Sequence, residues 1–122
     1  MTIRVGETGK KIYIITSFDM TSNTSLNIYA TPPSGVSNTK TWTAQLEIGS
    51  LSNIVLEDGT AVTSVAANQS MFYELADSTD LSEDGDWTLV GEYINTGASP
   101  DDRFLSDPVI LTVSKDNITE LE

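Results

Sequence analysis

Alternation of apolar and polar residues, repeated in short runs, most constrains the fold of this chain. Successive side chains of a β-strand point to opposite faces, so a two-residue period predicts a strand with one buried face. Residues 41–48 follow this pattern, with Trp42, Ala44, Leu46 and Ile48 on one face. The same period predicts strands at residues 10–16, 25–30, 70–76, 86–94 and 108–114, and a weaker one at 53–59 that ends in an Asp58-Gly59 turn.

Turn-forming residues separate these runs, as in "PPSG" at 32–35 and "NTGASPDD" at 95–102. Short alternating strands joined by Gly, Pro, Asn and Asp are typical of sandwiches and barrels. The 122 residues show no break in composition, and one domain is usual at this length. We therefore predict a single all-β domain over residues 1–122, with a short C-terminal tail at 115–122.

Two tryptophans lie in phase with the apolar faces of their predicted strands. Trp42 and Trp87 would each bury a large area between two packed sheets. A platform on which sugars stack is the alternative interpretation. Both tryptophans fall on the apolar face of their strand, however, and this favours a place in the core. The expected core residues are Trp42, Leu46, Tyr73, Gly85, Trp87 and Leu89.

The chain contains neither cysteine nor histidine. Ser-His and Cys-His nucleophiles, thiolate or imidazole metal sites and disulfides are therefore excluded. A pair of carboxylates could still hydrolyse a glycoside, with Asp84, Asp86, Asp101 and Asp102 as candidates. These acids lie in polar loops, where carboxylates stay solvated, so we predict neither an enzyme nor a cofactor.

Six basic and eighteen acidic residues give a formal net charge of −12. This charge disfavours nucleic acid and anionic lipid as partners, because both are bound through lysine and arginine. No segment approaches the ~20 apolar residues of a membrane span, and the longest apolar run near the start is Ile12–Ile15. We expect no signal peptide, no membrane partner and synthesis in the cytoplasm.

The acid-rich segment "DLSEDGDW" raises the question of a metal site. Asp80, Ser82, Asp84 and Asp86 are candidate calcium ligands, since the start of the segment matches the first half of a calcium-binding loop. The pattern fails at its twelfth position, which is Gly91 instead of a bidentate glutamate. We predict no metal here and keep calcium as the lesser alternative.

The same segment resembles a structural corner of immunoglobulin-like domains. Leu81, Glu83, Gly85, Trp87 and Leu89 recur at every second position, similar to the L-x-D-x-G-x-Y-x-C pattern of the penultimate strand. Tryptophan stands in the tyrosine position, and its indole N–H is able to donate to a carbonyl in place of the hydroxyl. The expected fold class is an all-β, immunoglobulin-like antiparallel β-sandwich of about seven to eight strands.

Several short sequence segments occur in an order that resembles the sequences of small virion proteins of tailed bacteriophages. These segments are "IRVGETGK" (3–10), "TSFDMTSNT" (16–24), "YATPPSG" (29–35), "GDWT" (85–88), "TGASPDDRF" (96–104) and "PVILTV" (108–113). Together they are similar to the immunoglobulin-like N-terminal domain of phage baseplate upper proteins. The resemblance implies a non-enzymatic virion subunit present in many copies, whose partners are other virion structural proteins and copies of itself. It does not distinguish among the head, neck, tail and baseplate as the location of the subunit.

The start of the chain is a candidate assembly arm, residues 1–10. Arg4, Lys10 and Lys11 are half of the six basic residues, and they could dock against the acidic face of a neighbour. On this hypothesis, deleting residues 1–9 stops incorporation into particles and leaves the fold intact. The alternative is a first strand that completes its own sheet.

A carbohydrate- or host-surface-binding module is the alternative function, because small sandwiches often carry such sites. Aromatic side chains grouped on one face would favour it. The residues to compare are Tyr13, Tyr29, Phe72 and Phe104.

Overall fold

The computed structural model describes residues 3–16, 18–55 and 61–115, with the backbone alone at residues 54 and 55. Within these ranges the regular structure consists of β-strands in three sheets and one 3-10 turn, η1 (Val36–Asn38). The chain is therefore all-β, as the two-residue period predicts.

The largest sheet, sheet A, is built around the long strand β9 (Gly85–Asn95). Its other strands are β1 (Ile3–Arg4), β3 (Ser25–Thr31), β4 (Lys40–Thr43), β10 (Asp102–Leu105) and β11 (Val109–Ser114). The order is β1-β11-β9-β3-β4. The first half of β9 pairs with β11 and its second half with β10, while β3 runs along its other side. The sheet is mixed, because β1 is parallel to β11.

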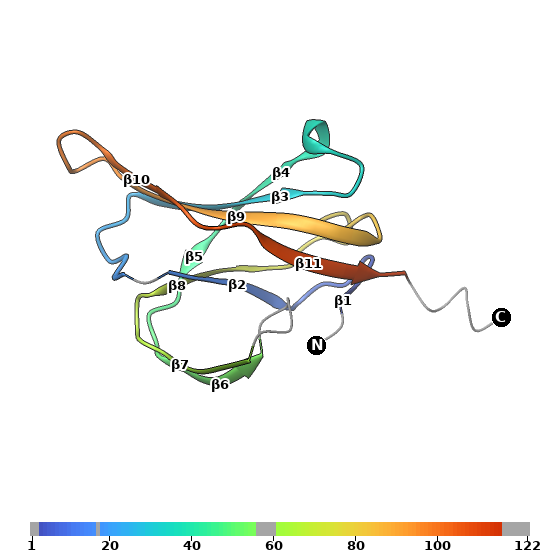
Figure 1. Ribbon diagram of the computed structural model, residues 1–122, viewed down its shortest axis with the longest axis horizontal. Helices are drawn as coiled ribbons and strands as arrows, with labels where there is room; N and C mark the ends of the chain where they lie inside the picture. The colour runs from blue at the N-terminus through green and yellow to red at the C-terminus, as the bar shows by residue number, and fades with distance from the viewer. Residues whose placement is uncertain (1–2, 17, 56–60, 116–122) are drawn as a thin grey trace.

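Two smaller sheets lie below sheet A in the view of Figure 1. Sheet B contains β2 (Lys11–Ile15), β8 (Ser70–Glu74) and β5 (Gln45–Leu46), with β8 in the middle. Sheet C is the pair β6 (Leu51–Val55) and β7 (Ala61–Val65), drawn on the side of sheet B away from sheet A. This arrangement of packed sheets is sandwich-like.

Side chains from sheets A and B meet in one core. Trp87 is fully buried and Leu89 is nearly so. Trp42 of sheet A is also buried, and it stacks on Tyr73 of sheet B with ring centroids 4.7 Å apart and planes inclined by 13°. Leu46 and Tyr73 are partly buried against this core. The structure thus confirms that these residues belong to the core or its border.

The strand predicted over residues 41–48 is wrong as a single element. Its first part, β4, pairs with β3 in sheet A, and its second part, β5, pairs with β8 in sheet B. Ala44 lies between the two parts, and its N–H donates to the carbonyl of Leu26. The chain changes sheet at this corner, as strands of sandwiches can. Beyond the corner Ile48 is 77% exposed, so it does not face the core.

Residues 3–10 are attached to the domain. Ile3 is fully buried, and Ile3 and Arg4 pair with the end of β11. Further along, the N–H of Gly9 donates to the carbonyl of Leu75 at 2.6 Å. Within one chain the segment therefore completes its own sheet, which is the second of the two alternatives. Its role in assembly stays a prediction.

Two strands were not predicted, β7 and β10, and β1 was predicted only as the alternative to an assembly arm. The weak strand expected at residues 53–59 corresponds to β6, which begins two residues earlier, at Leu51. The Asp58-Gly59 turn lies outside the described residues. So does the expected tail, except for Lys115.

Candidate functional site

The corner before β9 is held by Trp87 and Gly85. The indole Nε1–H of Trp87 donates to the carbonyl of Glu83 at 2.9 Å, which confirms the expected bond from the indole to a carbonyl. Gly85 has a φ of +116°, and a Cβ at this position would lie 2.8 Å from Cγ of Pro33. The corner therefore requires glycine for both its backbone angle and its close contact.

Asp80 is engaged in the loop that leads to this corner. Its Oδ2 accepts hydrogen bonds from the Tyr73 hydroxyl at 2.8 Å and from the N–H groups of Ala76 and Asp77 at 2.9 and 3.1 Å. Burial and the bond to this carboxylate raise the pKa of Tyr73 to about 12. Asp80 thus orders the loop and connects it to the core.

The structure does not bring the four candidate calcium ligands together. Asp80 is directed at Tyr73, and Asp86 accepts a hydrogen bond from Thr112 at 2.8 Å. Ser82 and Asp84 are exposed. In the described part of the chain, no three acidic side chains are grouped so that they could hold a metal ion. Asp101 and Asp102, the other two carboxylates considered for glycoside hydrolysis, are exposed.

A polar network lies on the outer face of sheet A, and its centre is Glu92. The Glu92 carboxylate is 3% exposed and accepts from Tyr29 Oη at 2.7 Å, Asn27 Nδ2 at 3.1 Å and Arg103 Nε at 2.7 Å. Burial raises the pKa of Glu92, but the three hydrogen bonds and the charge of Arg103 outweigh it, so the pKa lies below its ordinary value.

One large apolar side chain lies beside this network, and a second lies further along the same face of sheet A. Leu105 is opposite Glu92 in the β10–β9 register, and it is 47% exposed. Ile110 of β11 faces the same way as Leu105 by strand alternation, and it is 46% exposed. Exposed large apolar side chains on a face that also carries a buried, hydrogen-bonded carboxylate are typical of protein-binding surfaces.

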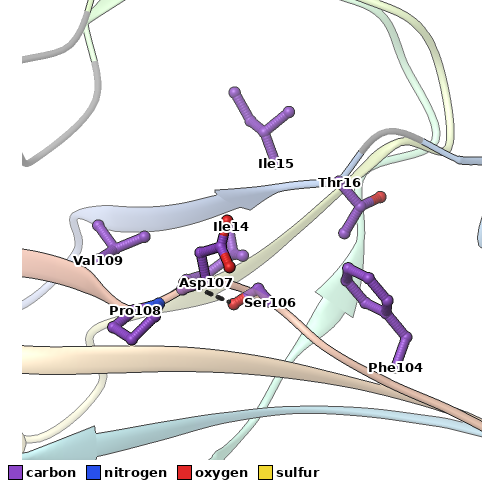
Figure 2. Close-up of a pocket in the computed structure, with 8 residues that line it drawn as sticks. All are labelled: Ile14, Ile15, Thr16, Phe104, Ser106, Asp107, Pro108 and Val109. Atoms are coloured by element: carbon purple, nitrogen blue, oxygen red, sulfur yellow. Dashed lines mark hydrogen bonds between the residues drawn. The ribbon is translucent and has the colours of Figure 1, made fainter.

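A groove of about 400 Å³ runs between the edges of sheets A and B (Figure 2). One wall comes from β2 and the residue after it, Thr16. The other wall comes from Phe104, Pro108 and Val109, with Asp107 between the apolar residues. Figure 2 shows Ile14 directed towards the segment of Asp107, whereas Ile15 points away from it.

Comparison with known proteins does not assign the chain to a family. No family model matches the chain, and neither the curated proteins nor the solved structures contain a match. Among the described residues, no helix is long and apolar enough to cross a bilayer.

The aromatic residues considered for sugar binding are not grouped on one face. Tyr13 and Phe72 are neighbours on the outer face of sheet B, with ring centroids 5.8 Å apart. Tyr29 belongs to the outer face of sheet A, where it contacts Glu92. Phe104 instead packs against Phe18, which in turn contacts Tyr93. A hollow of about 280 Å³ opens there, lined by Phe18, Tyr93, Asp102, Arg103 and Phe104.

Near the start of the chain, Lys10 and Lys11 contact partners through their side chains, and Arg4 does so through its backbone N–H. Lys10 Nζ forms an ion pair with Glu7 Oε2 at 2.9 Å, and the N–H of Arg4 donates to Glu7 Oε1, also at 2.9 Å. Lys11 Nζ lies 4.7 Å from the centre of the Phe72 ring. Glu7 therefore offsets part of the positive charge on which the arm hypothesis depends.

Sequence reasoning missed the Glu92 network and the groove beside β2. The network joins side chains from β3, β9 and β10, so only the strand register reveals it. The groove had a signal in the sequence, because Ile12–Ile15 is an uninterrupted run of four apolar residues.

Proposed function

We propose that the chain is a non-enzymatic structural subunit of a tailed-phage virion, built as an immunoglobulin-like sandwich. The strand order supports the fold part. Sheet A has the order of the G, F, C and C′ strands of such domains, with β1 parallel to the last strand, and sheet B has the order of B, E and D. The hydrogen bond from Trp87 to Glu83 stands where those domains have their tyrosine corner.

The outer face of sheet A is the observation that carries the assembly part. Leu105 and Ile110 are each about half exposed there, Leu105 opposite Glu92 and Ile110 further along the same face, opposite Thr88. Such a face is suited to contacts between subunits. The phage origin rests on the order of the sequence segments that resemble virion proteins. It implies several copies around a symmetric particle, with other virion proteins as neighbours.

The test is incorporation into particles. Particles assembled from the phage genome that encodes the chain should contain it in a fixed stoichiometry, and immunogold labelling should place it on the head, neck, tail or baseplate. Replacing Leu105 and Ile110 together by aspartate should reduce incorporation, whereas Ile48→Asp, at an exposed site near the sheet crossing, should not. A wild-type chain found only outside particles would refute the proposal.

A carbohydrate-binding module remains the second candidate because of the hollow at Phe18, Tyr93 and Phe104. Aromatic side chains next to an acid and an arginine can stack on a sugar ring and bind its hydroxyls. Binding to a glycan array that is lost in Phe104→Ala, with unchanged thermal stability, would support this function. An array without a signal would remove it.

A further inference from the structure

The outer edge of β2 offers backbone hydrogen-bonding groups. The N–H of Leu75 donates to the carbonyl of Lys10, and the N–H of Thr16 donates to the carbonyl of Gln69. Hydrogen-bonded pairs alternate along an antiparallel ladder, so the N–H and C=O groups of Lys11, Tyr13 and Ile15 point away from β8. Within the described ranges, no other strand pairs with this edge of β2.

This edge has little of the usual protection against strand addition. Exposed edges are commonly blocked by charged residues, proline or a bulge. Lys11 protects the beginning of β2, but the run Ile12–Ile15 has no charge and no proline, and three of its four residues are isoleucine. The run therefore has a high tendency to pair with another strand.

The groove next to this edge has room for an extended segment. Its volume is about 400 Å³, and Phe104, Pro108 and Val109 form its apolar side. Recognition by strand addition uses backbone bonds along one edge and pockets for alternate side chains. The edge of β2 and the groove provide these two elements side by side.

Charge indicates which segment fits. Asp107 is the charged residue among those that line the groove, and the whole chain carries −12. A second copy would bring the same negative charge, and like charges oppose association. We propose that the groove beside β2 binds an extended, basic segment of a partner protein, which pairs with β2 as an added strand of sheet B. This inference rests on the proposed function only in taking the partner to be another subunit of the particle.

A peptide selection tests the site on the full-length chain. The probe is a random library of peptides of about ten residues, the upper length of common strands, displayed on yeast. Enriched peptides should be rich in Lys and Arg among β-branched residues, and methylation of alternate backbone nitrogens should abolish their binding. Asp107→Lys should weaken binding about tenfold or more, whereas Asp84→Lys, the same charge change at an exposed site elsewhere, should not. Absence of enrichment, or equal binding to both variants, would overturn the proposal.

Hydrogen exchange and a second variant locate the added strand. On saturation with a selected peptide, the amides of Lys11, Tyr13 and Ile15 should become protected, and unchanged exchange would contradict strand addition. Ile15→Pro removes one outward N–H without removing a bond to β8, so it should block peptide binding. In particles, absence of the wild-type chain refutes the proposed function alone. Equal incorporation of wild type, Ile15→Pro and Asp107→Lys refutes this site alone.

Discussion

Gly85 and Trp87 determine the same corner in two different ways. The glycine permits a backbone angle and a contact with Pro33 that a side chain would prevent. The tryptophan fills the core with its ring and donates its single N–H to the carbonyl of Glu83. The exposed acid just before the glycine, Asp84, has neither role, and Asp84→Asn should change stability by less than about 0.5 kcal/mol.

Substitution of Gly85 by alanine should destabilise the chain more than the same change at Gly35. Both glycines have a positive φ, +116° and +124°, so each substitution should cost about 1–3 kcal/mol in backbone strain. Only Gly85→Ala also forces a Cβ against Pro33, whereas no atom lies within 4 Å of a Cβ at Gly35. Urea denaturation should show the larger loss at Gly85. Equal losses would mean that Pro33 moves aside freely.

Replacement of each tryptophan by phenylalanine should separate packing from hydrogen bonding. Trp42 and Trp87 are both buried, but in the described structure the Nε1–H of Trp42 has no hydrogen-bond partner. Trp87→Phe should therefore cost about 1 kcal/mol more than Trp42→Phe, since it leaves the Glu83 carbonyl without its donor. Equilibrium unfolding of both variants measures this difference. A larger loss for Trp42→Phe would contradict the role of the indole bond.

At the level of elements, β9 connects most of the molecule. It pairs with β3 on one side and with β10 and β11 on the other. Its inward residues, Trp87 and Leu89, belong to the core, whereas Glu92 on the opposite face binds side chains of both flanking strands. The strand thus joins an apolar core to a charged network on the outer surface.

Acid should weaken the network at Glu92. Its folded-state pKa is below the ordinary value, so the network contributes stability above the unfolded-state pKa of about 4.3, and this contribution is lost as pH falls through the folded value. Glu92→Gln should cost about 1–3 kcal/mol near neutral pH, with a smaller loss of stability on acidification than wild type. Urea midpoints as a function of pH measure both slopes, and parallel curves would exclude Glu92 as a source of acid sensitivity.

Strand β1 should contribute to stability. Ile3 is fully buried, so Ile3→Ala should cost about 2–5 kcal/mol, while Thr8→Ala, at an exposed position, should have little effect. Deleting residues 1–9 should then lower the melting temperature, contrary to the expectation that the fold is unaffected. A truncated chain with an unchanged melting curve would restore that expectation.

For the whole molecule, the formal charge of −12 is the dominant electrostatic property. Self-repulsion of this size opposes the compact state, and salt screens it. Only two ion pairs are found among the described residues, Lys10–Glu7 and Arg103–Glu92. Apart from Glu7 and Glu92, the acidic side chains in the described part of the chain form no ion pair, so their charges add to the overall field.

Divalent cations should stabilise the chain without discrimination. Calcium and magnesium at equal concentration should raise the melting temperature equally, because both act on the overall field and the acids of residues 80–86 do not form a ligand set. Differential scanning calorimetry measures both shifts. A distinctly larger shift with calcium would indicate a specific site that binds the native state.

Much of the fold could be predicted because strand alternation is a local property. The buried faces of β3 and β9 follow directly from their two-residue period. The break at Ala44 could not be predicted, since residues 41–48 alternate smoothly across it. β7 and β10 were not predicted because β7 has a single buried residue, Val65, and all four residues of β10 are exposed, so neither strand shows a buried face with a two-residue period.

The candidate surfaces were less predictable than the fold. The bond from Trp87 to Glu83 spans four residues and was expected from a local pattern. The Glu92 network joins residues up to 65 positions apart, and its members have no shared local pattern. The burial of a given acidic side chain depends on its neighbours in adjacent strands. These neighbours are brought together only by the strand register.

The parallel pairing of β1 with β11 has a mechanical consequence. Because the two strands run in the same direction, the chain enters the pair at Ile3 and leaves it at Ser114, at opposite ends. A stretching force applied between these two residues would slide the strands along each other and strain their connecting bonds together rather than one after another. The pair would therefore resist tension between Ile3 and Ser114 in shear, with its bonds loaded at the same time.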